Sequence, residues 1–285
     1  MLLKRFRTGF SIAGIICISV GLFCGARYMG WMEQDSSPLG NLARFVYGPD
    51  VRREMNRLKI VKETTPEIPR ITAMCYHEVR PDRREDSMNV NPETFRRHIR
   101  EFKEAGYSFI GVNDLRQYKT GLKNLPEKAA FITFDDGYAD NYNYAYPILR
   151  EEHVPGIFFV VSSTVGGKNR MTASQLREMQ ANGMEIESHT VNHENLAVMN
   201  EKEIDFELRE SKSSLEKILG KPVCALAYPG GKADEEVLES VRKYYDMAFV
   251  ASVSPERKQT MYTLQRYGVF NWNEHIESIF KTDNE

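Results

Sequence analysis

The sequence predicts an α/β fold in which parallel strands form a sheet that is closed, or nearly closed, into a barrel. From Ile71 onward, short apolar runs alternate with amphipathic helical patterns, and this alternation implies a parallel sheet with right-handed crossovers. Four of the apolar runs end in histidines, in aspartates or in a glycine turn. The ends of parallel strands meet at one edge, where α/β enzymes keep their active sites.

The expected strands are short and apolar, and they occupy residues 71–76, 107–112, 129–134, 156–161, 184–188, 225–228, 247–250 and 264–269. The expected helices occupy residues 91–105, 113–120, 140–152, 172–182, 201–219, 234–244 and 273–280. Their ends carry specific signals. Asn91 is placed to cap the first of these helices, Pro92 suits the first helical position, and Gly106 suits its end. We expect the charged residues of the helix at 201–219 to face solvent.

Composition excludes one class of partner and one class of chemistry. The formal net charge of −2 gives no electrostatic basis for binding nucleic acid. The four cysteines lie at 17, 24, 75 and 224 without a CxxC pair. Cys75 and Cys224 fall inside predicted strands, so we expect buried free thiols and no thiolate chemistry.

The N-terminal region predicts export. Three basic residues precede an uncharged apolar segment at 10–26, which is compatible with a membrane anchor whose N-terminus is cytoplasmic. We therefore expect residues 1–32 to be an anchor, with the catalytic part outside the cell membrane. Cleavage after Ala26 is the alternative and would give a secreted protein. Residues 33–70, polar and rich in proline, read as a stalk, and residues 71–285 as the catalytic domain.

Two adjacent carboxylates follow the strand at 129–134. Asp135 and Asp136 precede Gly137, and successive strand side chains point to opposite faces, so the two aspartates can serve different partners. One can bind a cation while the other stays free as a base. A turn without function is the alternative for these residues alone.

A histidine pair follows the strand at 184–188. His189 and His193 are four residues apart, a spacing that brings both imidazoles to one face of a helical turn. Two histidines and one carboxylate make a metal site with open positions, suited to zinc or a similar divalent ion. The pair alone could equally be structural, but the aspartates at another strand end favour a metal site.

Two further strand ends carry candidates, and one aromatic residue does not. His77 follows the strand at 71–76 and could protonate a leaving group. Tyr228 and Gly230 belong to a Tyr-Pro-Gly-Gly turn whose amides could stabilise an oxyanion, although a simple tight turn is equally compatible. We expect Trp272 to lie in the core, and a sugar-facing aromatic is the alternative.

These residues resemble the polysaccharide deacetylase family, also called carbohydrate esterase family 4 or the NodB-homology domain. Thr-Phe-Asp-Asp-Gly at 133–137 is similar to its first motif, and Ser-His-Thr-Val-Asn-His at 188–193 is similar to its second. The resemblance covers roughly residues 71–270. It implies a distorted (β/α) barrel with fewer strands than eight, so we expect about seven parallel strands.

The resemblance also implies roles. Asp135 would be the catalytic base, and Asp136, His189 and His193 would bind the divalent metal. Residues 71–79 look like the start of the branch that de-N-acetylates poly-N-acetylglucosamine. In that branch the acid histidine precedes the aspartates, so His77 would be the general acid.

The chain departs from the family pattern at two points. The third motif usually carries an arginine two residues before its proline, where this chain has Ala227. We expect Arg266, on a late strand, to orient Asp135 instead, and Tyr228 and Gly230 to contact the substrate or its oxyanion. A late acid histidine is not evident, which is consistent with the role given to His77.

The sequence therefore predicts a metal-dependent hydrolase, with zinc favoured, that removes N-acetyl groups from an N-acetylhexosamine polysaccharide such as poly-N-acetylglucosamine or peptidoglycan. The alternatives are an O-deacetylase of the acetyl-xylan type and a non-catalytic glycan-binding surface protein. A glycosidase is disfavoured because adjacent aspartates cannot flank a sugar bond.

Overall fold

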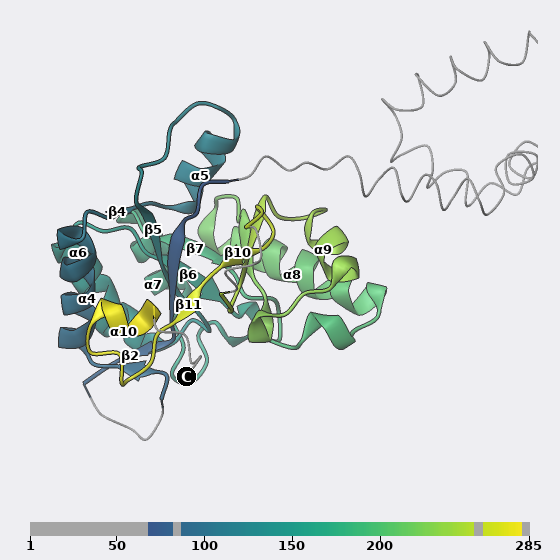
Figure 1. The fold of residues 1–285 in the computed structure, drawn as a ribbon. Helices are drawn as coiled ribbons and strands as arrows, with labels where there is room; N and C mark the ends of the chain where they lie inside the picture. The colour runs from purple at the N-terminus through teal and green to yellow at the C-terminus, as the bar shows by residue number, and fades with distance from the viewer. Residues whose placement is uncertain (1–67, 82–86, 254–258, 281–285) are drawn as a thin grey trace, which may run out of the picture. The chain divides into compact units, whose positions relative to one another are not determined.

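A parallel sheet organises the part of the chain that the computed structural model describes, which is residues 68–81, 87–253 and 259–280 (Figure 1). The strand order is β10-β9-β8-β7-β6-β5-β1-β11, with β4 paired to β5, and every pairing in this sheet is parallel. The strands are β1 (Thr72–Tyr76), β4 (Ser108–Phe109), β5 (Ala129–Phe134), β6 (Ile157–Val160), β7 (Glu185–Ser188), β8 (Ala225–Ala227), β9 (Met247–Val250), β10 (Leu264–Gln265) and β11 (Tyr267–Gly268). The predicted barrel-like α/β fold is confirmed.

One late segment nearly closes this sheet. β10 pairs with β9 at one end of the strand order, and β11 pairs with β1 at the other. Only Arg266 separates β10 from β11, so the yellow C-terminal segment in Figure 1 runs beside the blue β1. The path counts eight strands where about seven were expected, because this one segment contributes two.

Seven α-helices among the described residues connect the strands (Figure 1). They are α4 (Pro92–Glu104), α5 (Val112–Lys119), α6 (Tyr146–Glu151), α7 (Ala173–Ala181), α8 (Glu201–Leu219), α9 (Glu235–Val241) and α10 (Ile276–Phe280). Asn91 caps α4 as predicted, its side chain accepting the Glu93 N–H at 2.9 Å. The helix expected at 140–152 begins instead with a π-helical turn, η1 (Asn141–Ala145). The strand expected at 107–112 is reduced to β4, and a separate parallel pair joins β2 (Glu78–Val79) to β3 (Asn89–Val90).

Aromatic side chains fill the barrel interior. Phe131 on β5 and Phe159 on β6 both contact Phe249 on β9, with ring centroids 5.4 and 5.2 Å apart. β9 lies three places from β6 in the strand order, so these contacts cross the inside of the sheet. The alternate residues Phe134 and Phe158 stack at 4.6 Å and belong to the second core cluster, which includes residues of the helices. Alternation along each strand thus builds two cores.

Several predictions fall on residues that the structure does not describe. Residues 1–67 contain the expected membrane segment, most of the stalk, Cys17 and Cys24. Within the described ranges, no helix has the length and apolar character needed to cross a membrane. Cys75 and Cys224 are buried free thiols, as predicted.

A buried carboxylate joins β7 to β8. The two strands share one registered pair, Ser188 with Leu226. Beside it, the Glu187 carboxylate accepts the N–H groups of Cys224 and Ala225, each at 2.7 Å. The Glu187 side chain thus takes the place of the backbone carbonyl groups that would accept these N–H groups in a regular parallel pairing. Burial, opposed by these two hydrogen bonds, raises the pKa of Glu187 to about 8.

This raised pKa predicts a pH-dependent stability. Between the usual pKa of 4.5 and about 8, folded Glu187 binds a proton that the unfolded chain releases. Its contribution to the free energy of unfolding therefore falls as pH rises, by at most about 1.4 kcal/mol per pH unit. Glu187→Gln keeps an oxygen acceptor but does not titrate, so we expect a flatter profile. Urea unfolding of the wild-type protein and Glu187→Gln between pH 4.5 and 8 measures the two dependences of stability on pH. Parallel dependences would contradict a raised pKa of Glu187.

Candidate active site

The chemistry-bearing residues gather at the carboxyl ends of the strands, as the parallel topology requires. His77 follows β1, Asp135 and Asp136 follow β5, and His189 follows β7. Arg266 is the single residue between β10 and β11, and its side chain extends to Asp135 in the same region. Contacts between these side chains divide the site into a candidate base and a cluster of candidate metal ligands.

Asp135 forms a buried bidentate pair with Arg266. Nη1 donates to Oδ1 at 2.6 Å and Nη2 donates to Oδ2 at 2.8 Å. Asp135 is 3% exposed and Arg266 is fully buried. The guanidinium also donates to the Thr133 hydroxyl at 3.0 Å and to the Val250 carbonyl at 3.3 Å. A guanidinium matches a carboxylate in this geometry, so the orientation of Asp135 is fixed.

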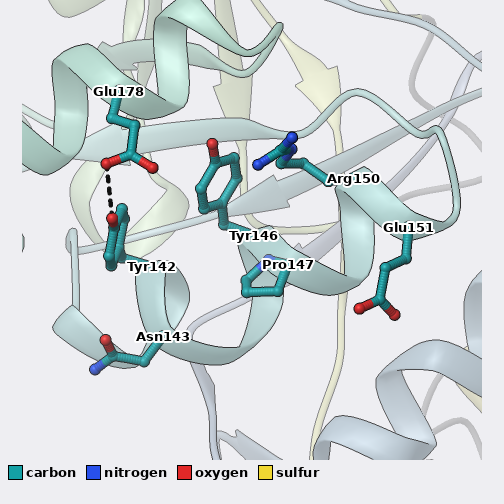
Figure 2. A pocket seen from close by; sticks show the side chains of 7 residues that line it. All are labelled: Tyr142, Asn143, Tyr146, Pro147, Arg150, Glu151 and Glu178. Atoms are coloured by element: carbon teal, nitrogen blue, oxygen red, sulfur yellow. Dashed lines mark hydrogen bonds between the residues drawn. The ribbon is translucent and has the colours of Figure 1, made fainter.

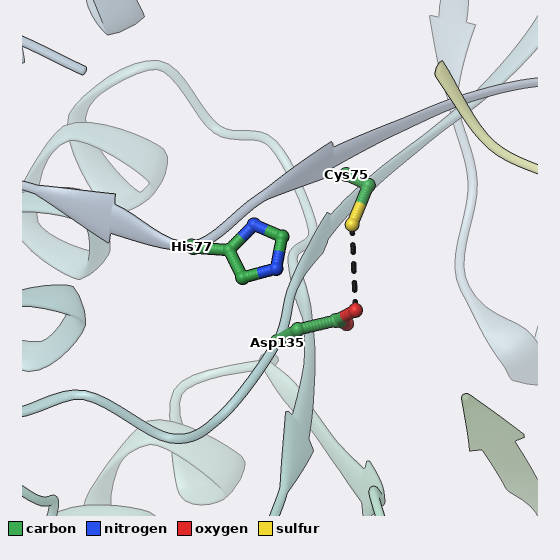
Figure 3. Close-up of side chains that lie close together, drawn as sticks. All are labelled: Cys75, His77 and Asp135. Carbon is green, nitrogen blue, oxygen red and sulfur yellow. Dashed lines mark hydrogen bonds between the residues drawn. The ribbon is translucent and has the colours of Figure 1, made fainter. Parts of the chain in front are cut away.

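The surroundings of Asp135 keep it ionised. Burial would raise its pKa, but the charge and hydrogen bonds of Arg266 outweigh burial and hold the pKa well below its usual range. The Cys75 thiol donates to Oδ2 at 3.4 Å, and Figure 3 shows the His77 ring beside this pair. Ligand atoms of Cys75, His77 and Asp135 lie within 4.8 Å of one another. An ionised carboxylate therefore lies close to an imidazole.

A second cluster converges on the neighbouring aspartate. Asp136 Oδ1 lies 3.3 Å from His193 Nε2 and 3.6 Å from His189 Nε2. The same oxygen is buried and has no hydrogen-bond partner among the described residues. His189 Nδ1 donates to the Ala227 carbonyl at 2.8 Å, which leaves Nε2 directed at the carboxylate. Burial lowers the pKa of His189 despite the nearby aspartates, so its neutral form is favoured.

These three residues fit a divalent cation. A buried oxygen of Asp136 faces the Nε2 atoms of His189 and His193. Because Nδ1 of neutral His189 carries the proton, its Nε2 has a free lone pair. One carboxylate oxygen and two imidazole nitrogens are ligands that suit zinc and related ions. The bond from His189 to the Ala227 carbonyl is the kind of outer contact that orients a metal-binding histidine. A cation would satisfy the otherwise unpartnered Asp136 oxygen.

The histidine segment is a loop, so the expected helical turn was wrong. Thr190 and His193 have left-handed backbones, with φ of 65° and 61°, and the rings meet with centroids 4.7 Å apart. The N–H groups of Val191 and Asn192 donate to the Glu207 carboxylate at 2.8 and 2.9 Å. Because the Glu207 carboxylate accepts these two N–H groups, they do not need the backbone carbonyl acceptors that a helical turn would provide.

Glu207 is the site residue that sequence reasoning missed. It lies on α8, is 3% exposed, and also accepts the Asn192 amide at 2.7 Å. The expectation that the charges of this helix face solvent is wrong for this residue. The sequence did contain a signal for this burial, because Glu207 lies on the same helix face as the apolar residues Ile204, Leu208 and Leu215.

The turn after β8 was expected to place both Tyr228 and Gly230 at the substrate, but Tyr228 does not lie there. The Tyr228 hydroxyl donates to the Tyr262 carbonyl at 3.1 Å, and the Tyr228 amide donates to the Phe249 carbonyl at 3.0 Å. Tyr228 is therefore a core residue with both donors used, which corrects its placement at the substrate. Gly230 has φ of 65° and open space around it. The close backbone approach occurs at Gly231, where a Cβ would lie 2.6 Å from Ala251.

Trp272 does not lie in the core as expected. It is 58% exposed and stacks on Phe270 at 4.6 Å with an interplanar angle of 9°. The Phe270 ring lies over Gly268, where a Cβ would approach it to 3.0 Å. The indole therefore rests on another ring at the surface.

Comparison with known proteins identifies the family. Residues 122–248 match the polysaccharide deacetylase family profile. The chain is 30% identical over 202 residues to the putative polysaccharide deacetylase YxkH of Bacillus subtilis, covering 70% of this chain and 71% of that protein. This chain belongs to the polysaccharide deacetylase family. It is accordingly a hydrolase of the deacetylase class.

Other relatives agree with this assignment. The poly-β-1,6-N-acetyl-D-glucosamine N-deacetylase of Staphylococcus aureus is 28% identical over 169 residues, and the match spans 54% of this chain and 58% of that enzyme. The Streptococcus pyogenes deacetylase PplD, solved with acetate, superposes with a TM-score of 0.67 at 25% identity, over 75% of this chain and 98% of that one. IcaB from Ammonifex degensii shares the fold, with a TM-score of 0.65 at 23% identity over 73% of this deacetylase and 95% of IcaB.

The buried pair predicts a large effect of removing the arginine. In Arg266→Met, Asp135 would remain buried without a compensating charge, which costs about 3–5 kcal/mol of unfolding free energy. We expect this loss in urea unfolding, together with a loss of acetate release. Arg209→Met, on the exposed face of α8, is the control and should leave both nearly unchanged. Wild-type stability in Arg266→Met would contradict the pairing.

The Glu207 contacts predict an indirect effect on metal affinity. Glu207→Ala releases the loop that carries His193, and loss of such outer contacts lowers metal affinity about 10–100-fold. Competition for Zn²⁺ with a chromophoric chelator measures this change. Glu210→Ala, on the same helix, should keep wild-type affinity. Equal affinities in the two variants would show that the loop orders itself without Glu207.

Proposed function

We propose that this deacetylase removes N-acetyl groups from an N-acetylhexosamine polysaccharide in a reaction that depends on a divalent metal. The observation that carries the proposal is the contrast between two adjacent carboxylates. Asp135 is ionised and fully compensated by Arg266, whereas the Asp136 oxygen is buried, unpartnered and faced by two imidazoles. One carboxylate is thus available as a base and the other as a ligand.

Asp136, His189 and His193 would hold the metal, and their oxygen and nitrogen donors favour Zn²⁺. When bound, such an ion polarises the acetyl carbonyl and lowers the pKa of water. His189 would be kept in the ligating tautomer by the Ala227 carbonyl. Glu207 would hold the loop between the two histidines.

Asp135 would act as the general base. It accepts a proton from the water whose oxygen attacks the acetyl carbon, while Arg266 keeps the carboxylate oriented. His77 donates a proton to the amide nitrogen as the carbon–nitrogen bond breaks, so the products are acetate and an amine. Gly230 is an exposed residue, and its amide would donate to the oxyanion.

Poly-β-1,6-N-acetylglucosamine is the substrate that we favour, with peptidoglycan second. The staphylococcal relative bears this substrate in its name, and residues 71–79 resemble the same branch of the family. Acetyl-xylan, an O-ester, is the alternative substrate. A non-catalytic glycan-binding role is disfavoured because both aspartates and all three histidines are retained.

We further propose the domain order inferred from the sequence. Residues 1–32 would anchor the protein in the cell membrane, residues 33–70 would form a stalk, and residues 71–285 would act outside the cell. Basic residues before the apolar segment support this orientation. Cleavage of the segment would instead release a secreted enzyme.

Replacing the base gives the direct test. We expect Asp135→Asn to lower acetate release from a β-1,6-linked N-acetylglucosamine oligomer by roughly 10²–10⁴-fold. Bound zinc, measured by atomic absorption, should stay at the wild-type level because Asp136 is untouched. Wild-type turnover in this variant would reject Asp135 as the base.

Metal removal tests the rest of the proposal on the wild-type protein. We expect a chelator to abolish acetate release and added Zn²⁺ to restore it. Peptidoglycan and acetyl-xylan, assayed in parallel, identify the polymer. Release that resists complete chelation would exclude metal dependence.

A further inference from the structure

A pocket lies on the outside of the barrel, and none of its lining residues belongs to the candidate active site. It has a volume of about 570 Å³ and is lined by η1, α6 and α7 (Figure 2). Its lining includes Tyr142, Asn143, Tyr146, Arg150 and Glu178. None of these residues has a role in the reaction proposed above.

Two tyrosines form the aromatic part of this pocket. The rings of Tyr142 and Tyr146 stack with centroids 5.6 Å apart and an interplanar angle of 26°. The Tyr142 hydroxyl donates to the Glu178 carboxylate at 2.8 Å, which ties η1 to α7. Tyr142 is partly exposed, so it offers apolar ring surface of the kind that packs against the carbon–hydrogen face of a sugar.

The Tyr146 hydroxyl lacks a partner. The residue is 4% exposed, and its Oη forms no hydrogen bond among the described residues. A buried polar group without a partner is costly and rare. Figure 2 shows this hydroxyl directed toward the side of the pocket where Glu178 and Arg150 lie. A ligand that donates to or accepts from this hydroxyl would remove the cost.

The charges beside this hydroxyl suit a polar, uncharged ligand. Among the described residues, neither Arg150 nor Glu178 forms an ion pair, and Arg150 lies 5.7 Å from the centroid of the Tyr146 ring. The other lining acid, Glu151, is paired with Arg96 at 2.7 Å. Arg150 and Glu178, which form no salt bridge with any residue that the structure describes, together offer donors and acceptors with no net charge, as the hydroxyl groups of a sugar require.

We propose that this pocket binds an N-acetylhexosamine unit of the polysaccharide away from the catalytic site. The identity of this ligand rests on the proposed function. Asn141, directly before Tyr142, donates its amide to the His77 carbonyl at 2.8 Å, so the pocket wall begins next to the catalytic loops. A polymer bound at both places gains affinity without new contacts at the catalytic centre.

The test uses the full-length protein with Asp135→Asn, to prevent turnover, and a β-1,6-linked N-acetylglucosamine oligomer as the probe. Isothermal titration calorimetry compares Tyr142→Ala and Tyr146→Phe with Tyr144→Ala. Tyr144 is an exposed tyrosine of the same π-helical turn that does not line the pocket. We expect the two pocket variants to weaken binding about five- to tenfold, or roughly 1–1.4 kcal/mol, and the control to leave it unchanged.

Tyr146→Phe separates binding from folding. It removes only the unpartnered hydroxyl, so thermal unfolding should show an equal or higher Tm. Weaker binding with the fold intact supports the pocket. Wild-type affinity in both pocket variants overturns it.

Acetate release by the wild-type protein, measured separately, keeps the two proposals distinct. If the oligomer is deacetylated but the pocket variants bind normally, the pocket proposal fails alone. If binding depends on the tyrosines but none of the polysaccharides is deacetylated, the pocket stands and the proposed reaction fails.

Discussion

The bidentate pair between Arg266 and Asp135 is the interaction on which both the fold and the site depend. Arg266 lies where the last segment passes from β9 to β1, so the residue that nearly closes the barrel also orients the proposed base. A buried guanidinium requires acceptors on several sides, and Asp135, Thr133 and Val250 provide them. Burying these charges is costly, and the four hydrogen bonds of the guanidinium offset that cost.

The two aspartates have different surroundings because their backbones differ. Asp135 continues from β5 into the barrel, while Asp136 adopts a left-handed conformation with φ of 71°. This change of direction moves the second carboxylate from Arg266 to the histidine loop. One group is stabilised as an anion by a fixed cation, and the other has an oxygen left to be satisfied. Environment, rather than residue type, separates the two functions proposed for these carboxylates.

Local patterns predicted much of this molecule, and tertiary contacts account for the rest. The strands at 129–134 and 247–250 and the helix at 201–219 have the predicted bounds, because apolar runs, periodicity and caps are local signals. The conformation of the His189 loop was not predicted, since a spacing of four says nothing about the backbone between two residues. Glu207 acts on that loop through space. Tyr228 was expected at the substrate, but its amide pairs with Phe249 of β9 and the residue lies in the core. The register between two strands cannot be read from the sequence of one strand.

The late position of Arg266 has a consequence for biosynthesis. It lies 131 residues after its carboxylate partner, and the N-terminal part of a chain leaves the ribosome first. The nascent polypeptide therefore carries both aspartates and both loop histidines before the stabilising cation exists. The active centre matures only when the C-terminal segment docks between β9 and β1. A translation product truncated before this segment would carry every proposed metal ligand and still lack an oriented carboxylate at Asp135.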